Sequence, residues 1–214
     1  MKIQILGPEA RNKNIIEALS TQHELFFTEN DVTLNDLKNK GVEFVLSNGY
    51  APILKSPIIE AYTRKIVNIH PAYLPQGRGI FPNFWCFFEG FPIGATIHYI
   101  DEGIDTGEII FREEVNFDKT ETLRTTIVQL MRLAEHLFLK NAENILSGHV
   151  TAVEQEQRDN NRFYHTRELS EYFIELLPNG WDTTIDHVEK TGRDFLLSAD
   201  CINQVIKEIE HQHD

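Results

Sequence analysis

Residues 65–70 read Lys-Ile-Val-Asn-Ile-His, and residues 94–107 read Gly-Ala-Thr-Ile-His-Tyr-Ile-Asp-Glu-Gly-Ile-Asp-Thr-Gly. Both stretches begin as apolar, strand-like runs and end in polar or glycine-rich residues. Successive side chains of a strand point to opposite sides, so Asn68 and His70 share one side of the first strand. Pro71 disfavours a helix at His70 and leads the chain into a loop. The ends of adjacent strands are where an open α/β sheet presents its chemistry.

Outward from these stretches, the first third of the chain alternates between short apolar runs and segments with helical spacing. The pattern predicts strands at residues 2–6, 23–28, 43–47 and 65–69, and helices at 11–20, 34–40 and 56–63. Such alternation is typical of parallel sheets with helices on their faces. We therefore expect an α/β fold: a Rossmann-like, open, mostly parallel sheet with helices on both faces.

Beyond Pro71 the pattern changes. We expect a shaped loop at 71–82, a helix at 83–89 with Asn83 as its N-cap, antiparallel strands at 94–100 and 108–115, and a long amphipathic helix at 120–145. A polar, exposed connection at 151–162 and short helices near 167–177, 183–190 and 199–211 complete the prediction. This organisation predicts a catalytic domain over 1–150 and a small helical C-terminal extension over 151–214, packed on that domain.

Composition limits the classes of partner. The 214 residues include 33 acidic and 20 basic side chains, giving a formal net charge of −13. So acidic a chain repels polyphosphate, which argues against nucleic acid as the main partner but not against one phosphorylated small molecule. No apolar run approaches the roughly 20 residues of a membrane span, and the N-terminus reads as a strand without a signal-peptide cleavage site. Cys86 and Cys201 are the only cysteines, so we expect a reduced, cytoplasmic compartment and no membrane association.

Asn68, His70 and Asp105 are the parts of an acyl-transfer site. If Asp105 reaches His70 from its glycine-flanked turn, the carboxylate orients the imidazole and raises its pKa. The Asn68 amide can donate to an oxygen that gains negative charge, a contact worth roughly 2.7–4 kcal/mol where such donors have been removed. No Ser or Cys lies in either quoted stretch. The attacking group is therefore expected to come from a substrate, most simply an amine.

The motifs resemble a known family. Asn-Ile-His-Pro at 68–71, Leu-Pro-Gln-Gly-Arg-Gly at 74–79 and Thr-x-His-x-Ile-Asp-x-Gly-Ile-Asp-Thr-Gly at 96–107 are similar to the formyltransferase domain that uses N10-formyltetrahydrofolate. The resemblance is dense over 43–115, and it implies a formyltransferase fold with Asn68, His70 and Asp105 as the catalytic trio. It also implies that two segments wrap the pterin of the formyl donor: Asn48, Gly49, Tyr50, Ala51, Ile53, Leu54, Asp101, Gly103 and Ile104.

Within that family, the chain is most similar to enzymes that N-formylate nucleotide-linked amino sugars, of the dTDP-amino-dideoxyhexose type. The features that carry this are the form of 78–85, the turn 100–107 and Gly-Trp-Asp-Thr at 180–183. Glycinamide ribonucleotide enzymes have more sequence before the Asn-x-His strand and a Gly-Ser-rich turn where this chain has Gly-Pro-Glu-Ala-Arg-Asn at 7–12. Methionyl-tRNA enzymes add a C-terminal β-barrel, for which we expect no room here.

The resemblance implies that the substrate binds near Arg78, Gly79 and Pro82. An ordinary surface arginine in a loop is an equally good interpretation of Arg78. Two alternatives remain: a glycinamide ribonucleotide transformylase-like enzyme, and a non-catalytic folate- or nucleotide-binding relic. We expect no metal, and the long apolar helix leaves a homodimer open.

Three further side chains have a purely structural interpretation beside a functional one. His98, in the middle of an apolar strand, is expected to be packed and hydrogen-bonded, with a supporting role at the site as the second interpretation. Arg11 and Lys13 are better explained as solvated surface charges than as contacts to a phosphate.

Overall fold

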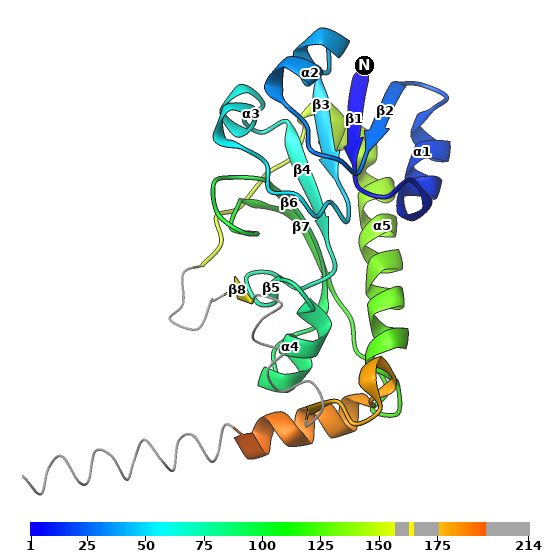
Figure 1. Cartoon of the computed structure of the whole chain (residues 1–214), viewed down its shortest axis with the longest axis vertical. Coiled ribbons are helices and arrows are strands. Elements are labelled where there is room, and N and C mark those ends of the chain that lie inside the picture. The colour runs from blue at the N-terminus through cyan, green and yellow to red at the C-terminus, as the bar shows by residue number, and fades with distance from the viewer. Residues whose placement is uncertain (157–162, 165–175, 196–214) are drawn as a thin grey trace, which may run out of the picture.

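The computed structural model describes residues 1–156, 163–164 and 176–195. Its centre is a six-stranded sheet of order β2-β1-β3-β4-β6-β7 (Figure 1). The strands are β1 (Lys2–Leu6), β2 (Glu24–Thr28), β3 (Phe44–Ser47), β4 (Ile66–His70), β6 (Gly94–Tyr99) and β7 (Ile109–Glu114). The pairs β2–β1, β1–β3 and β3–β4 are parallel, whereas β4–β6 and β6–β7 are antiparallel. The predicted mostly parallel sheet is confirmed.

The helices are α1 (Lys13–Leu19), α2 (Leu34–Lys40), α3 (Ser56–Ala61), α4 (Pro82–Glu89) and α5 (Leu123–Ser147), with short 3-10 turns η1 (Glu9–Asn12) and η2 (Gly180–Asp182). A further helix covers 185–195, which confirms the one predicted near 183–190. A two-stranded parallel sheet joins β5 (Arg78–Gly79) to β8 (Phe163–Tyr164). The helix predicted near 199–211, and nearly all of the one near 167–177, lie outside the described residues. None of the described helices combines the length and the apolar character needed to cross a membrane.

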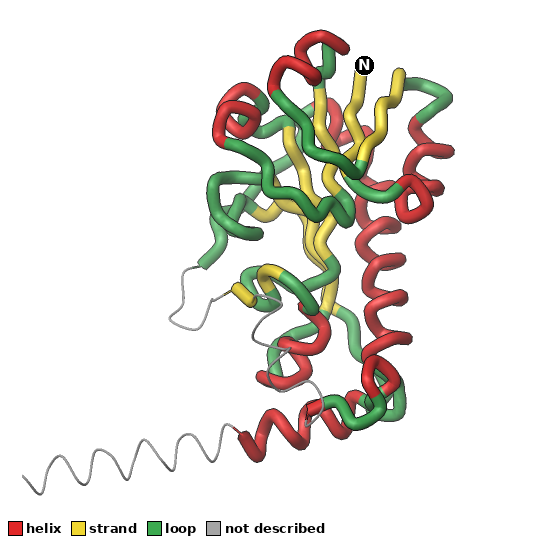
Figure 2. The backbone as a smooth tube through the Cα atoms, in the orientation of Figure 1, coloured by secondary structure: helices red, strands yellow, loops and turns green. Residues whose placement is uncertain are grey.

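Helices cover both faces of the sheet, as the sequence predicts. On one face α1 and the long α5 pack against alternate strand residues, and Figure 2 shows α5 running along that side of the sheet. On the other face α2 and α3 pack against residues such as Val45 and Ile66. A third apolar cluster joins α4 to the first turns of α5 and to residues 177–188.

Strand parity decides which side chains reach the site. Val67 and Ile69 belong to the cluster under α5, so Asn68 and His70 point to the opposite face. The antiparallel register sets His98 of β6 directly opposite Asn68. Directly opposite residues on one face of an antiparallel pair are close enough to interact. The β4–β6 pair therefore gathers an amide and two imidazoles on one face.

The start of α4 differs from the prediction. Its N-cap is Phe81, in the left-handed region at φ 52°, and Asn83 makes no capping bond. Instead the buried Asn83 amide donates to the Leu123 carbonyl at 2.8 Å and to the Thr126 hydroxyl at 3.2 Å. Because a polar group buried at a helix interface needs partners, Asn83 fastens α4 to the first turn of α5.

Candidate active site

Two cavities meet at the face that carries Asn68. The first has a volume of about 520 Å³ and the second about 340 Å³. Five residues line both cavities: Tyr50, Asn68, Gly79, Ile80 and Asp105. His70 lines only the first cavity and His98 only the second. The polar cluster therefore stands at the junction of two separate binding spaces.

Asp105 reaches this junction from an unexpected direction. Tyr99 pairs with Val67, so β6 runs away from His70 and its carboxyl end lies near the start of β4. The turn 101–107 folds back over the face of the sheet. Asp101 fastens the turn by accepting from the Gly103 N–H at 3.1 Å. The expectation of two neighbouring strand ends is thus replaced by a turn that lies across the face of the sheet.

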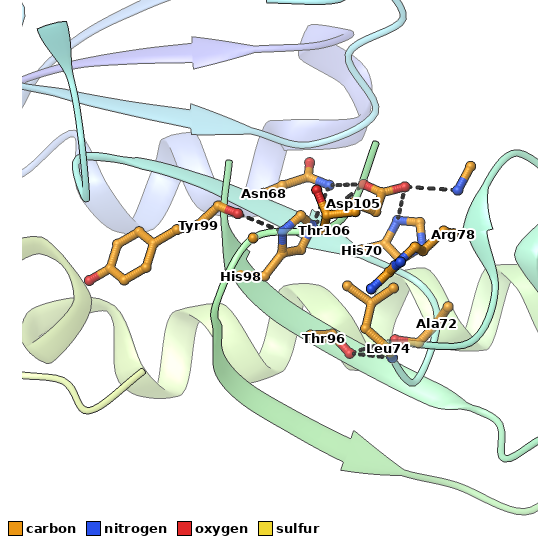
Figure 3. Close-up of polar contacts among 12 residues, drawn as sticks. Asn68, His70, Ala72, Leu74, Arg78, Thr96, His98, Tyr99, Asp105 and Thr106 are labelled. Atoms are coloured by element: carbon orange, nitrogen blue, oxygen red, sulfur yellow. Dashed lines mark hydrogen bonds and ion pairs between the residues drawn. The ribbon is translucent and has the colours of Figure 1, made fainter. Parts of the chain in front are cut away.

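The Asp105 carboxylate contacts every polar group of the cluster (Figure 3). Its Oδ2 accepts from the Gly79 N–H at 2.9 Å and lies 3.8 Å from Nδ1 of His70. Its Oδ1 accepts from Nδ2 of Asn68 at 3.3 Å and lies 3.5 Å from Nε2 of His98. The structure therefore brings the amide, imidazole and carboxylate named from the sequence into one group.

Burial and neighbours act in opposite directions on Asp105. Burial raises the pKa of this carboxyl, but attraction to the His70 and His98 imidazoles when these are protonated, together with the hydrogen bond from the Gly79 N–H, outweighs it and holds the pKa well below its ordinary value. Hydrogen bonds donated to a carboxylate favour its charged form. Asp105 is therefore a fixed negative charge at neutral pH.

His70 is a neutral base with one nitrogen available. Its Nε2 lies 3.0 Å from the Gly77 carbonyl, and because a carbonyl only accepts, Nε2 carries the hydrogen. In the neutral ring Nδ1 then holds the lone pair, on the side that faces Asp105. Burial lowers the pKa of His70 more than the charge of Asp105 raises it. The imidazole can take up a proton at Nδ1, and Asp105 stabilises the cation that results.

His98 fixes the orientation of Asn68. Nδ1 of His98 donates to the Tyr99 carbonyl at 2.7 Å, so Nε2 of the neutral ring accepts from the Asn68 amide at 3.1 Å. The expectation of a packed, hydrogen-bonded His98 is confirmed, and the ring also belongs to the site. Both amide hydrogens of Asn68 are engaged, one by His98 and one by Asp105. To donate to a substrate oxygen, Asn68 has to release one of them.

Thr96 secures the loop that follows β4. It lies opposite His70 in the register, and its hydroxyl donates to the Ala72 carbonyl at 2.7 Å while accepting from the Leu74 N–H at 3.1 Å. These contacts fix the start of the loop that carries the Gly77 carbonyl. The tautomer of His70 is therefore set by the path of this loop.

The second cavity is lined by most of the residues that the family resemblance assigned to the formyl donor. They are Tyr50, Ala51, Ile53, Leu54, Asp101, Gly103 and Ile104. Ile53 is 78% exposed at its rim. Asn48 lines neither cavity: it is buried, and its Oδ1 accepts from Nε of Arg11 at 3.0 Å. Gly49 lines the first cavity instead.

The position of Arg11 at the wall of a cavity was not predicted from the sequence. It is part-buried and lines the first cavity, so its interpretation as a solvated surface charge was wrong, whereas Lys13 is exposed as expected. A Cβ on Gly49 would lie 2.7 Å from the Arg11 side chain, so only glycine leaves room for it. Arg11 follows β1, and Gly49 follows β3. The strand order reverses between these two strands, the usual place for ligands in open α/β sheets.

The first cavity is completed by Trp181, which follows α5, and by Arg124 in the first turn of α5. Trp181 lines it and packs on Phe81, with ring centroids 4.9 Å apart. Arg124 lines it too, and its guanidinium donates to the Asp182 carboxylate at 2.7 Å. Among the residues expected at the substrate, Gly79 and Pro82 line this cavity, but Arg78 lines neither cavity.

Curated relatives share the part of the chain that carries the site. A phosphoribosylglycinamide formyltransferase from Bacillus subtilis is 38% identical over 116 residues, which is 54% of this chain and 59% of that protein. A methionyl-tRNA formyltransferase from Lachnospira eligens is 28% identical over 127 residues, which is 59% of this chain and 40% of that protein. The chain thus spans only about half the length of these relatives.

A solved structure matches over a greater length. The crystal structure of the formyltransferase PseJ from Anoxybacillus kamchatkensis contains UDP-4,6-dideoxy-4-formamido-L-AltNAc and tetrahydrofolate. It superposes with a TM-score of 0.81 at 34% identity, covering 89% of this chain and 100% of that one. The family model described as formyl transferase matches residues 7–142, which include the whole Asn68–His70–Asp105 group. The chain belongs to the formyl transferase family.

Proposed function

We propose that this protein transfers a formyl group from N10-formyltetrahydrofolate to the amine of a nucleotide-linked amino sugar. The observation that carries the proposal is the meeting of two cavities at Asn68 and Asp105. A transfer between two substrates needs both bound at once, with the reacting atoms at the catalytic groups. The similarity to PseJ, whose structure holds a formamido sugar nucleotide and tetrahydrofolate, supports the choice of substrates.

Each cavity suits one substrate. The second is largely apolar, which fits the flat ring of a pterin, and Asp101 at its edge can accept hydrogen bonds from ring N–H groups. The first carries the guanidinium groups of Arg11 and Arg124, which can contact the phosphates of a nucleotide. These two arginines provide local positive charge for a phosphate in a chain whose formal net charge is −13.

The side chains then have separate roles in the transfer. As the amine of the sugar attacks the formyl carbon, Nδ1 of His70 takes up the amine proton. Asn68 exchanges one of its internal partners for the formyl oxygen, which gains negative charge when the new C–N bond forms. Asp105 stabilises the His70 cation, and His70 returns the proton to N10 as the bond to tetrahydrofolate breaks. The products are a formamide and tetrahydrofolate.

An acceptor panel tests this proposal. We expect tetrahydrofolate release with UDP- or dTDP-linked amino sugars to have a kcat/KM about 100-fold above that with glycinamide ribonucleotide, since a site built around one substrate's polar groups rejects another strongly. The identity to the phosphoribosylglycinamide enzyme makes the ribonucleotide the second candidate. The opposite ratio would replace the sugar with the ribonucleotide. Folate binding without turnover on any acceptor would favour the non-catalytic relic.

The remaining assignments stay predictions. They are the division into a catalytic domain over 1–150 and an extension over 151–214, the homodimer and the cytoplasmic location. Trp181 in the wall of the first cavity supports a role for the extension in substrate binding.

A further inference from the structure

The side chain of Gln155 joins two segments of the site. Its Oε1 accepts from the Arg78 guanidinium, at 3.2 Å from Nε and 2.6 Å from Nη2. Its Nε2 donates to the carbonyl of Asp105 at 2.9 Å and to that of Gly107 at 2.7 Å. The donor and the acceptor of one carboxamide are therefore both engaged. Among the residues that the structure describes, Gln155 links the Arg78–Gly79 strand to the backbone of the Asp105 turn.

The segment that carries Gln155 is itself fixed to the sheet. Val153 exchanges two backbone hydrogen bonds with Ile109, the first residue of β7, at 2.8 and 2.9 Å. Gln155 lies two residues further along the same extended segment. Its carboxamide is therefore presented from a backbone that the central sheet holds in place.

The two segments joined by Gln155 form a catalytic contact. Gly79, next to Arg78, donates its N–H to Oδ2 of Asp105, and the same oxygen faces His70. Asp105 has φ of 53°, in the left-handed region. A non-glycine residue stays there only where its surroundings hold it. The hydrogen bonds from Gln155 to the carbonyls of Asp105 and Gly107 hold the turn in place at Asp105 and two residues beyond it.

We propose that Gln155 is a positioning residue, which holds the Asp105 turn against the Arg78–Gly79 strand so that the carboxylate faces His70. It does not line either cavity that meets at the site, and it acts through Asp105. The catalytic consequence rests on the proposed function, whereas the structural consequence does not.

Two substitutions distinguish the role of the carboxamide oxygen of Gln155 from the role of its NH₂ group. Gln155→Glu keeps an oxygen for Arg78 and adds a charge to that contact, but it turns an acceptor toward two carbonyls. Gln155→Met has a similar shape and removes both the donor and the acceptor. If the bond to Arg78 were the whole role of Gln155, the Glu variant would behave like the wild type and only the Met variant would be impaired. Glu154→Gln is the matched control, because Glu154 is the exposed neighbour.

Amide hydrogen exchange tests the structural consequence without any substrate. We expect the amides of Gly79 and Gly103 to exchange about tenfold faster in both Gln155 variants, since each loses the bonds that hold the turn. The Glu154→Gln protein should match the wild type. Unchanged exchange in the Glu variant would overturn the positioning role, whatever the activity.

Kinetics test the catalytic consequence. We expect both Gln155 variants to lose about 10- to 100-fold in kcat, with the acceptor KM little changed. The acidic limb of the pH profile of Gln155→Met should move to lower pH, because a displaced Asp105 supports the His70 cation less. A merely less stable protein would contain fewer active molecules and would leave the limb in place. Faster exchange with normal kcat and an unmoved limb would overturn the catalytic consequence. A wild type without formyl transfer would refute the proposed function but not the exchange result.

Discussion

We expect Asp105→Asn to lower kcat by about 10³- to 10⁴-fold, the size of loss found when an aspartate that supports a catalytic imidazole is made neutral. The substitution keeps the shape but removes the charge that stabilises the His70 cation. It also introduces a clash of donors. Oδ1 accepts from Asn68 and Oδ2 from Gly79, so the new NH₂ group has to face one of these N–H groups. Single-turnover formyl transfer measures the loss.

Asp118→Asn is the control for Asp105→Asn, because Asp118 caps an exposed turn by accepting from Thr120. Its rate should equal that of the wild type. Stability provides an independent check: the folded-state pKa of Asp105 lies below its ordinary value of 3.8. The ionised carboxylate therefore stabilises the folded state above that pH, and this contribution is lost as the pH falls through the folded-state pKa. A wild-type rate in Asp105→Asn would contradict the assigned role.

For His70→Gln we expect kcat to fall by about 10²- to 10⁴-fold, the usual range for loss of a general acid–base group. In the wild type, burial of His70 lowers its pKa from 6.5, so the base form should dominate at pH 7. The kcat/KM profile should then be flat near neutrality and fall only below pH 6.5. This acidic limb should be absent in the residual activity of His70→Gln.

His149→Gln is the matched control for His70→Gln, because His149 is exposed and, among the described residues, hydrogen-bonds only to Ser147. It should keep both the rate and the acidic limb of the wild type. The stability of the folded wild-type protein should also decrease at acidic pH because of His70. A buried imidazole that stays neutral takes up its proton less readily in the folded state, so stability falls as the pH drops below 6.5. An acidic limb above pH 7 in the wild type would contradict a neutral His70.

Local pattern was enough to predict most of the secondary structure. The helix expected at 34–40 has those bounds, and Gly41 ends it in the left-handed conformation. Buried strands such as 2–6 also have the predicted bounds, because apolar runs bounded by glycine and polar residues carry that information locally. The Asn83 prediction failed because a tertiary contact with α5 competes for the same amide.

The site was predictable where one strand or one turn carries the information. Asn68 and His70 follow from strand parity, and the glycines mark the Asp105 turn. A role for His98 at the site was only the second interpretation, and placing 94–100 antiparallel to 65–69, which sets His98 opposite Asn68, would have made it the first. Arg11 was missed because its burial depends on the absence of a Cβ at Gly49, far along the chain. Gln155 was missed because it lies in a polar stretch that resembles an exposed connection.

We infer that the formyl group passes directly between substrates bound in the two cavities that meet at Asp105. Direct transfer can be checked by measuring tetrahydrofolate release from the formyl donor, with and without the amino-sugar nucleotide, together with the mass of the intact protein. We predict release only when both substrates are present, intersecting initial-velocity lines and a protein of unchanged mass. A burst of release with the donor alone, accompanied by a formylated protein, would contradict direct transfer.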